Sequence, residues 1–173
     1  MTLAAVLLLS LAGRLPAGGS ASAADSLPAW IAVDSAGKSV TLTLDALPTT
    51  PAGGATLNGH HHGDIQLVVP INWTVRWTWV NRDSSQSHSL VVMTEREKLP
   101  TEGGRPSLDN AMTRAVTTGL KPGQKDLTSF LTDQAGWYWM LCGVPGHAIR
   151  GEWIGLKVDR AATGVSLVSK PTG

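Results

Sequence analysis

The sequence predicts an all-β fold, a sandwich of about seven to nine short strands, on three observations. Several segments alternate apolar and polar residues with a period of two, and turn-forming Gly, Pro, Asn or Asp residues bound them. In the clearest segment, 73–80, apolar side chains share one face and polar side chains the other, which is typical of a half-buried antiparallel strand. No segment sustains the period of a helix, which disfavours an α/β fold.

The expected strands follow one another along the chain with turns between them. They lie at 40–44, 65–69, 73–80, 88–93, 113–118, 125–131, 136–142 and 151–159. The stretch Glu95–Ser107 is charged and rich in Gly and Pro, which predicts a surface excursion, followed by one short helical turn around 108–111. The core is expected to hold the tryptophans at strand positions, Trp73, Trp77, Trp79, Trp137 and Trp139.

The start of the chain has the form of a signal peptide. Residues Leu3 to Ala12 are almost continuously apolar, and Ala21-Ser22-Ala23 has the small-x-small form of a cleavage site. This apolar run is shorter than the about twenty residues of a membrane span. We therefore expect residues 1–23 to be removed and the protein to be periplasmic or extracellular; an uncleaved leader would act as a weak anchor. The mature chain is expected to have no stable membrane span.

Residues 24–173 are expected to form a single domain, with its core at about 38–160 and a tail at 161–173. The chain holds 14 Lys and Arg residues against 13 Asp and Glu residues, and loss of the leader removes Arg14, so the net charge of the mature chain is close to zero. This balance, without a long block of like charge, argues against nucleic acid as a partner.

The single cysteine, Cys142, begins a short Gly/Pro segment that ends at His147. Pro145 fixes φ and the neighbouring glycines allow positive φ, so the turn can fold the imidazole back toward the sulfur. His88 stands alone far upstream, and Glu152 follows His147. One thiolate and two imidazoles form the trigonal ligand set that copper uses for one-electron transfer. The pattern therefore indicates one copper ion that cycles between Cu(II) and Cu(I).

The stretch 142–153 resembles the copper loop of the cupredoxins, the blue copper proteins, and most closely that of the sulfocyanins; the phytocyanins share its Cys-x4-His-x4 spacing. The resemblance covers roughly residues 40–158. It includes Gly136-Trp137-Tyr138-Trp139, Gln86-Ser87-His88-Ser89, Leu57-Asn58-Gly59 and Val69-Pro70-Ile71-Asn72-Trp73-Thr74-Val75. The resemblance implies a Greek-key β-sandwich or barrel, with His88, Cys142 and His147 as equatorial copper ligands.

The axial position departs from the family pattern. Sulfocyanins usually place methionine there and the stellacyanin branch of the phytocyanins glutamine, whereas this chain has Glu152. A carboxylate donates more strongly than a thioether and adds a negative charge, so it would favour Cu(II), lower the reduction potential and move a blue site toward green or red. Alternatively, Glu152 points to solvent or pairs with Arg150. Met93 and Met140 are expected in the core.

Three further features accompany the expected ligands. Ser89 follows His88, where the resemblance implies a hydrogen bond across to the cysteine loop; the alternative is a plain strand serine. Trp153 is expected to shield the metal or to offer an electron path. The consecutive histidines form either a solvated loop or an accessory metal site; they are His60, His61 and His62.

The copper pattern predicts a one-electron carrier outside the cytoplasm, and not an enzyme. Redox protein donors and acceptors would dock transiently on small and apolar residues around the site, which include Val144, Pro145, Ala148 and Ile149. Two alternatives are a red or green copper site with an open coordination position that binds small molecules, and a copper storage or delivery protein. A thiol hydrolase is disfavoured, because the spacing identifies no Asn or Asp that would orient a Cys-His pair.

Overall fold

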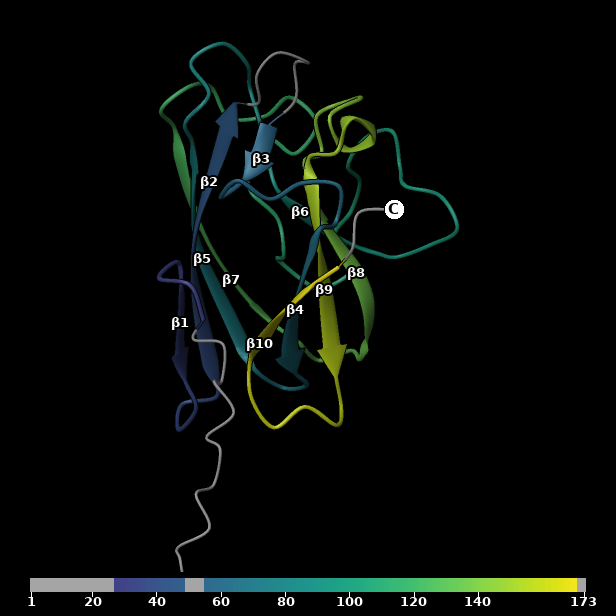
Figure 1. The fold of residues 1–173 in the computed structure, drawn as a ribbon. Coiled ribbons are helices and arrows are strands. Elements are labelled where there is room, and N and C mark those ends of the chain that lie inside the picture. The colour runs from purple at the N-terminus through teal and green to yellow at the C-terminus, as the bar shows by residue number, and fades with distance from the viewer. Residues whose placement is uncertain (1–26, 49–54, 171–173) are drawn as a thin grey trace, which may run out of the picture.

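The computed structural model describes residues 27–48 and 55–170, whose strands form two five-stranded sheets (Figure 1). The first sheet has the order β1-β2-β5-β7, with β3 on β2, and the second has the order β10-β4-β9-β8-β6. The strands are β1 (Ile31–Asp34), β2 (Ser39–Pro48), β3 (Ala55–Leu57), β4 (Ile65–Pro70), β5 (Thr74–Asn81), β6 (Val91–Thr94), β7 (Lys125–Leu131), β8 (Gly136–Leu141), β9 (Trp153–Asp159) and β10 (Ser166–Ser169). The all-β sandwich is confirmed.

Both sheets mix parallel and antiparallel pairs. β2 runs parallel to β5, and β4 runs parallel to β9, while the other pairs are antiparallel. The segment 73–80, expected as an antiparallel strand, therefore forms β5 with a parallel neighbour on one side and the antiparallel β7 on the other. Parallel neighbours must be joined by long connections, so each sheet brings together segments that are far apart in the sequence.

The apolar face of β5 lies in the main core. Val75, Trp77 and Trp79 are almost fully buried, while Arg76, on the opposite face, is exposed. The Trp77 ring packs edge to face on Phe130, with 5.2 Å between the ring centroids. The period-two pattern of this segment therefore identified the face of β5 that packs against the second sheet.

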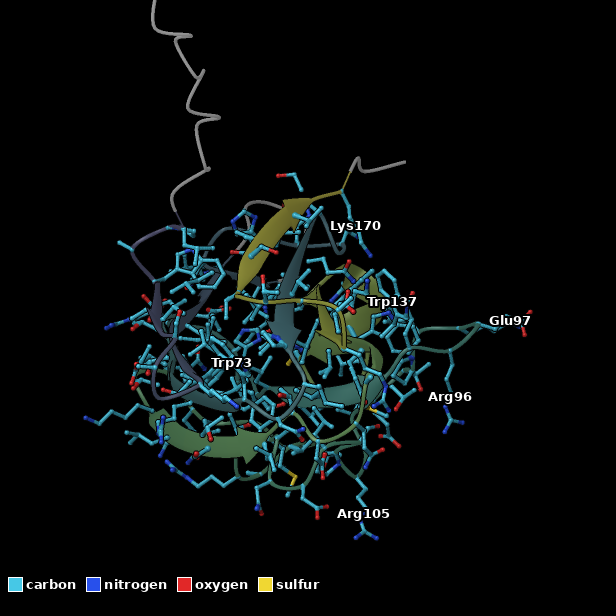
Figure 2. The ribbon with its side chains drawn as sticks, turned by 90° about the horizontal axis from the view of Figure 1, so that it is seen from below. Trp73, Arg96, Glu97, Arg105, Trp137 and Lys170 are labelled. Atoms are coloured by element: carbon cyan, nitrogen blue, oxygen red, sulfur yellow. The ribbon has the colours of Figure 1, made fainter. Side chains whose placement is uncertain are left out.

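The second sheet is covered on both faces near β6 and β8. Its outer face carries a smaller apolar cluster of Val91, Trp139, Leu141 and Ala148, and Leu99 from the excursion and Val116 from the segment before β7 pack against this cluster. Near the start of the excursion, Arg96 and Glu97 point away from the body of the protein (Figure 2). Cys142 directly follows β8, so protein covers it from both sides of the sheet.

The segment between β6 and β7 differs from the expected elements. No strand forms at 113–118, because Ala115 has a φ of 55° and accepts a turn hydrogen bond from Gly119 N at 2.7 Å. The expected helical turn at 108–111 is a single turn closed by one backbone hydrogen bond, from Ala111 N to Leu108 O at 3.0 Å. The one short helix of the described residues, the 3-10 helix η1 (Ala148–Arg150), lies instead in the loop after β8.

Two strands lie outside the stretch 38–160 that was expected to hold the core. β1 precedes residue 38, and β10 lies within the stretch expected as a tail, where it pairs with β4. Both are edge strands with mostly exposed side chains, so neither has the apolar alternation that marks a half-buried strand. The expected signal peptide, residues 1–23, lies outside the described residues. Within the described part of the chain, no helix is both long and apolar enough for a membrane span.

The tryptophans follow the expectation with one exception. Trp73, Trp77, Trp79 and Trp139 are buried, whereas the side chain of Trp137 is 47% exposed. Trp137 shares the outer face of β8 with Trp139, but the apolar cluster reaches only Trp139. The Nζ atoms of Lys157 and Lys170 lie 4.9 and 5.3 Å from the Trp137 ring centroid. Figure 2 shows Trp137 and Lys170 on the same side of the molecule. The prediction that Trp137 is a core residue was wrong because alternation does not show how far a face is covered.

Candidate metal centre

Four buried side chains from two distant parts of the chain meet at one point: His88, Cys142, His147 and Glu152. Their candidate ligand atoms all lie within 4.8 Å of one another. Glu152 Oε2 is 2.9 Å from His88 Nδ1 and 3.0 Å from His147 Nδ1, and the two Nδ1 atoms are 3.1 Å apart. Cys142 Sγ lies 3.6 Å from His147 Nδ1. No other such group of three or more His, Cys, Asp or Glu side chains is found among the residues described.

Three of these side chains come from the loop between β8 and β9. Cys142 N donates a hydrogen bond to Glu152 O at 3.0 Å, which closes the loop. Inside it, Gly146 has a φ of 81° and Gly151, after η1, has a φ of 101°, both in the left-handed region. These glycine turns direct the side chains of His147 and Glu152 back toward the sulfur, as the Gly/Pro pattern predicted.

His88 enters the site from the segment that follows β5. His88 N donates to Leu120 O at 3.2 Å and His88 O accepts from Leu120 N at 2.7 Å, an isolated bridge in place of the expected strand start. The buried Asn81 donates from Nδ2 to Leu120 O at 2.9 Å and to Gln86 O at 2.8 Å. A Cβ atom at Gly119 would lie 2.9 Å from His88 N, so the backbone approaches this closely only because residue 119 is glycine.

The arrangement of donor atoms fits a metal ion. Two imidazole nitrogens and a carboxylate oxygen face one another at about hydrogen-bond distance, which requires shared protons or a cation among them. Glu152 Oε1 is buried without a hydrogen-bond partner, and an unsatisfied buried carboxylate oxygen often marks an ion site. A set of one sulfur, two nitrogens and one oxygen suits a transition metal.

The acid-base properties of the site show what such a cation would replace. Burial raises the pKa of the Cys142 thiol, and the carboxylate of Glu152 raises it further. Burial acts to lower the pKa of His88, but Glu152 and Asp83 outweigh it and raise that pKa. Burial acts to raise the pKa of Glu152, but His147 and His88 lower it. The protein alone thus holds protons on Cys142 and His88, which a metal ion would displace.

The side chain of Glu152 lies inside the cluster. Its side chain is fully buried and faces both histidines, so the alternative that it points to solvent is wrong. The neighbouring Trp153 packs edge to face on Trp139, with 6.5 Å between the ring centroids. Met140 lies in the main core and Met93 packs against the outer cluster, as expected.

Ser89 connects the two parts of the site. Its backbone N–H donates to Cys142 Sγ at 3.4 Å. Its hydroxyl accepts a hydrogen bond from Gly143 N at 2.9 Å and donates to Val116 O at 2.6 Å. The hydrogen bond across to the cysteine loop, which the resemblance implied, is therefore present.

Asp83 is a site residue that the sequence did not reveal. It is buried, and its Oδ2 atom lies 3.0 Å from His88 Nε2, on the side of the ring away from the cluster. Burial acts to raise its pKa, but hydrogen bonds from Ser85 and His88 outweigh burial and lower that pKa to about 2. The only sequence signal is an Asp two residues before Ser85 in a polar turn, a pattern common in surface loops.

The loop with the three histidines contacts the backbone on both sides of Glu152. His62 N donates to Gly151 O at 2.8 Å, and Gly63 N donates to Trp153 O at 3.0 Å. The His62 ring lies over Gly151, where an added Cβ would meet it within 2.3–2.5 Å. His60 pairs with Asp64 at 3.2 Å, and His61 packs edge to face on His62. An accessory metal role for these histidines stays a prediction.

Comparisons with known proteins identify a family and similar folds. A family model, the sulfocyanin (SoxE) domain, matches residues 27–168. No curated protein matches the sequence significantly. A copper nitrite reductase from Nitrosomonas europaea is 24% identical over 70% of this chain and 41% of its own, with a TM-score of 0.51. Rusticyanin from Thiobacillus ferrooxidans is 24% identical over 75% of this chain and 86% of its own, with a TM-score of 0.45.

The family model spans most of the chain, including both parts of the site. The expected cofactor is copper, which this family match and the cluster of His88, Cys142, His147 and Glu152 both support. The chain therefore belongs to the sulfocyanin (SoxE) family of cupredoxins.

Proposed function

We propose that His88, Cys142, His147 and Glu152 hold one copper ion and that the protein carries single electrons between redox partners outside the cytoplasm. The observation that carries this proposal is the convergence of one sulfur, two Nδ1 atoms and a carboxylate oxygen within 4.8 Å in a buried place. Bound copper supplies the one-electron couple.

The surroundings of the four side chains suit a carrier. Side chains that cannot rearrange keep the cost of changing oxidation state low, and here Asp83 contacts His88 and the Ser89 N–H donates to Cys142 Sγ. Three of the four are fully buried, and only His147 has exposed surface, at 5%. Next to it lies Ile149, which is 55% exposed, with Val144 and Pro145 nearby in the same loop. An electron would therefore enter or leave at the edge of His147, through a small apolar patch suited to brief encounters.

The charges of the site favour the oxidised ion. The Cys142 thiolate and Glu152 each bring a negative charge into a buried site, and Asp83 adds a third beside His88. Negative groups at short distance stabilise Cu(II) more than Cu(I). The reduction potential is therefore expected to be low, and Glu152→Met is expected to raise it.

The alternative of an open coordination position that binds small molecules is less well supported. Glu152 and His88 are fully buried, so no ligand side of the cluster other than the edge of His147 has exposed surface. The likeness to a nitrite reductase shows a shared fold and does not carry activity to this chain. Copper storage would require a second site, for which the histidine loop is the candidate.

Titration of the metal-free protein with Cu(II), followed by optical and paramagnetic-resonance spectra, tests the proposal. We expect one equivalent to give intense sulfur-to-copper absorption that disappears on reduction and returns on oxidation. Cys142→Ser is expected to abolish this absorption, while a matched variant outside the cluster, Ser169→Ala, leaves it unchanged. Absence of the band in the unaltered protein would refute the copper proposal, and azide-induced spectral changes would favour the open site.

A further inference from the structure

The carboxylate of Asp83 is fully engaged by neighbouring donors. Oδ2 faces His88 Nε2 at 3.0 Å, while Oδ1 accepts from Ser85 N at 2.7 Å and from Ser85 Oγ at 2.6 Å. Asn81 Oδ1 in turn accepts from Asp83 N at 2.9 Å. The side chain of Asp83 is 2% exposed and that of His88 is 0% exposed. Ser85 and Asn81, which do not belong to the metal cluster, therefore hold Asp83 in one orientation toward His88.

This contact determines which nitrogen of His88 faces the cluster. An ionised carboxylate only accepts hydrogen bonds, so His88 Nε2 must be the donor. A neutral imidazole that carries its proton on Nε2 leaves Nδ1 bare, and Nδ1 is the atom that points at Glu152 and His147. An asparagine at residue 83 would not fix this tautomer. Its single amide oxygen cannot accept hydrogen bonds from both His88 and Ser85, and its NH2 group would face another donor.

We infer that Asp83 is a positioning residue of the metal centre: it holds His88 in the tautomer that presents Nδ1 to the metal, and its buried charge favours Cu(II) over Cu(I). This inference rests on the proposed function. A carboxylate partner on the far nitrogen makes the imidazole a stronger donor to the metal, and loss of such a partner typically weakens metal binding by about 10- to 100-fold. The stronger donor and the negative charge both act more on the doubly charged ion.

Asp83→Asn tests the inference on the full chain loaded with copper. We expect Cu(II) affinity to fall about 10- to 100-fold and Cu(I) affinity to fall less. The reduction potential then rises by about 59 mV for each factor of ten by which Cu(II) affinity falls more than Cu(I) affinity. Asp126→Asn is the matched control, because this buried aspartate on β7 makes the same change of charge but pairs with Arg114 and contacts none of the four cluster residues. The control is expected to keep the potential of the unaltered protein.

Ser85→Ala provides a second test that does not threaten the fold, since Ser85 is exposed. Removing its hydroxyl leaves Asp83 Oδ1 with one donor fewer, so the carboxylate accepts more strongly from His88 and the potential is expected to fall, opposite to Asp83→Asn. The Nε2 proton of His88 should also give a slowly exchanging NMR signal in the Cu(I) protein, which Asp83→Asn removes.

The outcomes separate this inference from the proposed function. If the unaltered protein takes up no copper, or if His88→Ala keeps its copper spectrum, the proposed function fails. If the unaltered protein behaves as expected but Asp83→Asn and Asp126→Asn have the same potential, only the role of Asp83 fails. Should Asp83→Asn not fold, an unchanged or raised potential in Ser85→Ala overturns the inference by itself.

Discussion

The two parts of the chain that supply the cluster are fixed in different ways. Around His88, side chains make the contacts: Asn81, Asp83 and Ser89 are buried and hydrogen-bonded to the backbone or to the histidine itself. In the loop 142–153, backbone turns make the contacts, because glycines there adopt left-handed φ. The outer edge of this loop is largely exposed. One region is held by polar side chains, the other by backbone shape.

This difference assigns separate tasks to the two regions. The segment before β6 sets the tautomer and the charge of the buried imidazole, because its contacts are carboxylate and amide groups. The loop after β8 sets how closely the sulfur, His147 and Glu152 approach, because its contacts are conformational. Changes in the first region should act through electrostatics and changes in the second through geometry.

Acid is expected to produce the largest effect, and it acts on the two carboxylates that face His88, Asp83 in the first region and Glu152 in the second. Asp83 and Glu152 have lowered pKa values, so their contribution to stability is present above pH 4.5 and is lost as the pH falls, for Asp83 between 3.8 and about 2. Protonating them leaves the His88 imidazolium buried without a partner, which costs about 3–5 kcal/mol. His88 has a raised pKa, so its contribution is present below 6.5 and is lost as the pH rises through its folded value.

Denaturant unfolding of the metal-free protein between pH 2 and 9 checks this prediction. Stability is expected to be greatest between about pH 4.5 and 6.5 and to fall on both sides. A stability curve that is flat from pH 5 down to pH 2 would contradict an ionised pair of carboxylates around His88.

Asn81→Ala should give the next largest loss. Asn81 is fully buried and its amide makes three hydrogen bonds, from Nδ2 to Gln86 O and Leu120 O and to Oδ1 from Asp83 N. Leaving these backbone groups unsatisfied is expected to lower the free energy of unfolding by about 3 kcal/mol. Denaturant unfolding measures this change in the free energy of unfolding. A loss below about 1 kcal/mol would mean that side chains do not hold this region.

Gly151→Ala tests the loop. The φ of 101° strains any residue with a Cβ, and the added atom would meet the His62 ring, so we expect a loss of about 2 kcal/mol and a changed copper spectrum as Glu152 moves. Gly123→Ala is the matched control, since Gly123 has a φ of 76° but no atom within 4 Å of the added Cβ. It should lose stability without a spectral change. An unaltered spectrum in Gly151→Ala would show that this turn does not position Glu152.

His62→Ala should have the smallest effect, within about 0.5 kcal/mol, because its ring is exposed and its backbone bond to Gly151 O remains. Added to Gly151→Ala, it should remove the clash and restore part of the stability, leaving the strain of positive φ. Calorimetric copper titration of His62→Ala also tests the histidine loop: loss of a second copper equivalent would support an accessory site, and unchanged stoichiometry would leave only the contact with Gly151.

The ligand loop could be predicted from the sequence because its chemistry is local. Cys142, His147 and Glu152 lie within one short segment, and the glycines between them require left-handed turns. Asp83 could not be predicted, because an aspartate in a polar turn has no mark that distinguishes a solvated side chain from one packed under an imidazole. Its role depends on the bridge between His88 and Leu120, which exists only in the folded chain.

Some strands could likewise be predicted from local sequence, and one expected strand could not. The segments that became β2 and β5 alternate strongly because one face is buried over their whole length. The stretch 113–118 is rich in the β-branched residues that are common in strands, yet Ala115 turns the chain there with a positive φ, and Val116 packs against the outer face of the second sheet. The prediction that Trp137 is buried failed for a related reason. Contacts between segments distant in sequence determine how much of the outer face of the second sheet is covered.

Placing three of the four metal-binding groups between β8 and β9 has a consequence for biosynthesis. Hairpins form early because their contacts are local, whereas the contact of Cys142 with Ser89 spans 53 residues and closes late. A nascent hairpin therefore offers a thiolate, an imidazole and a carboxylate before His88 arrives, a set that zinc accepts. Chains that mature in zinc-rich surroundings are expected to capture that ion first, and copper, which such a ligand set binds more tightly, would have to displace it once His88 has completed the site.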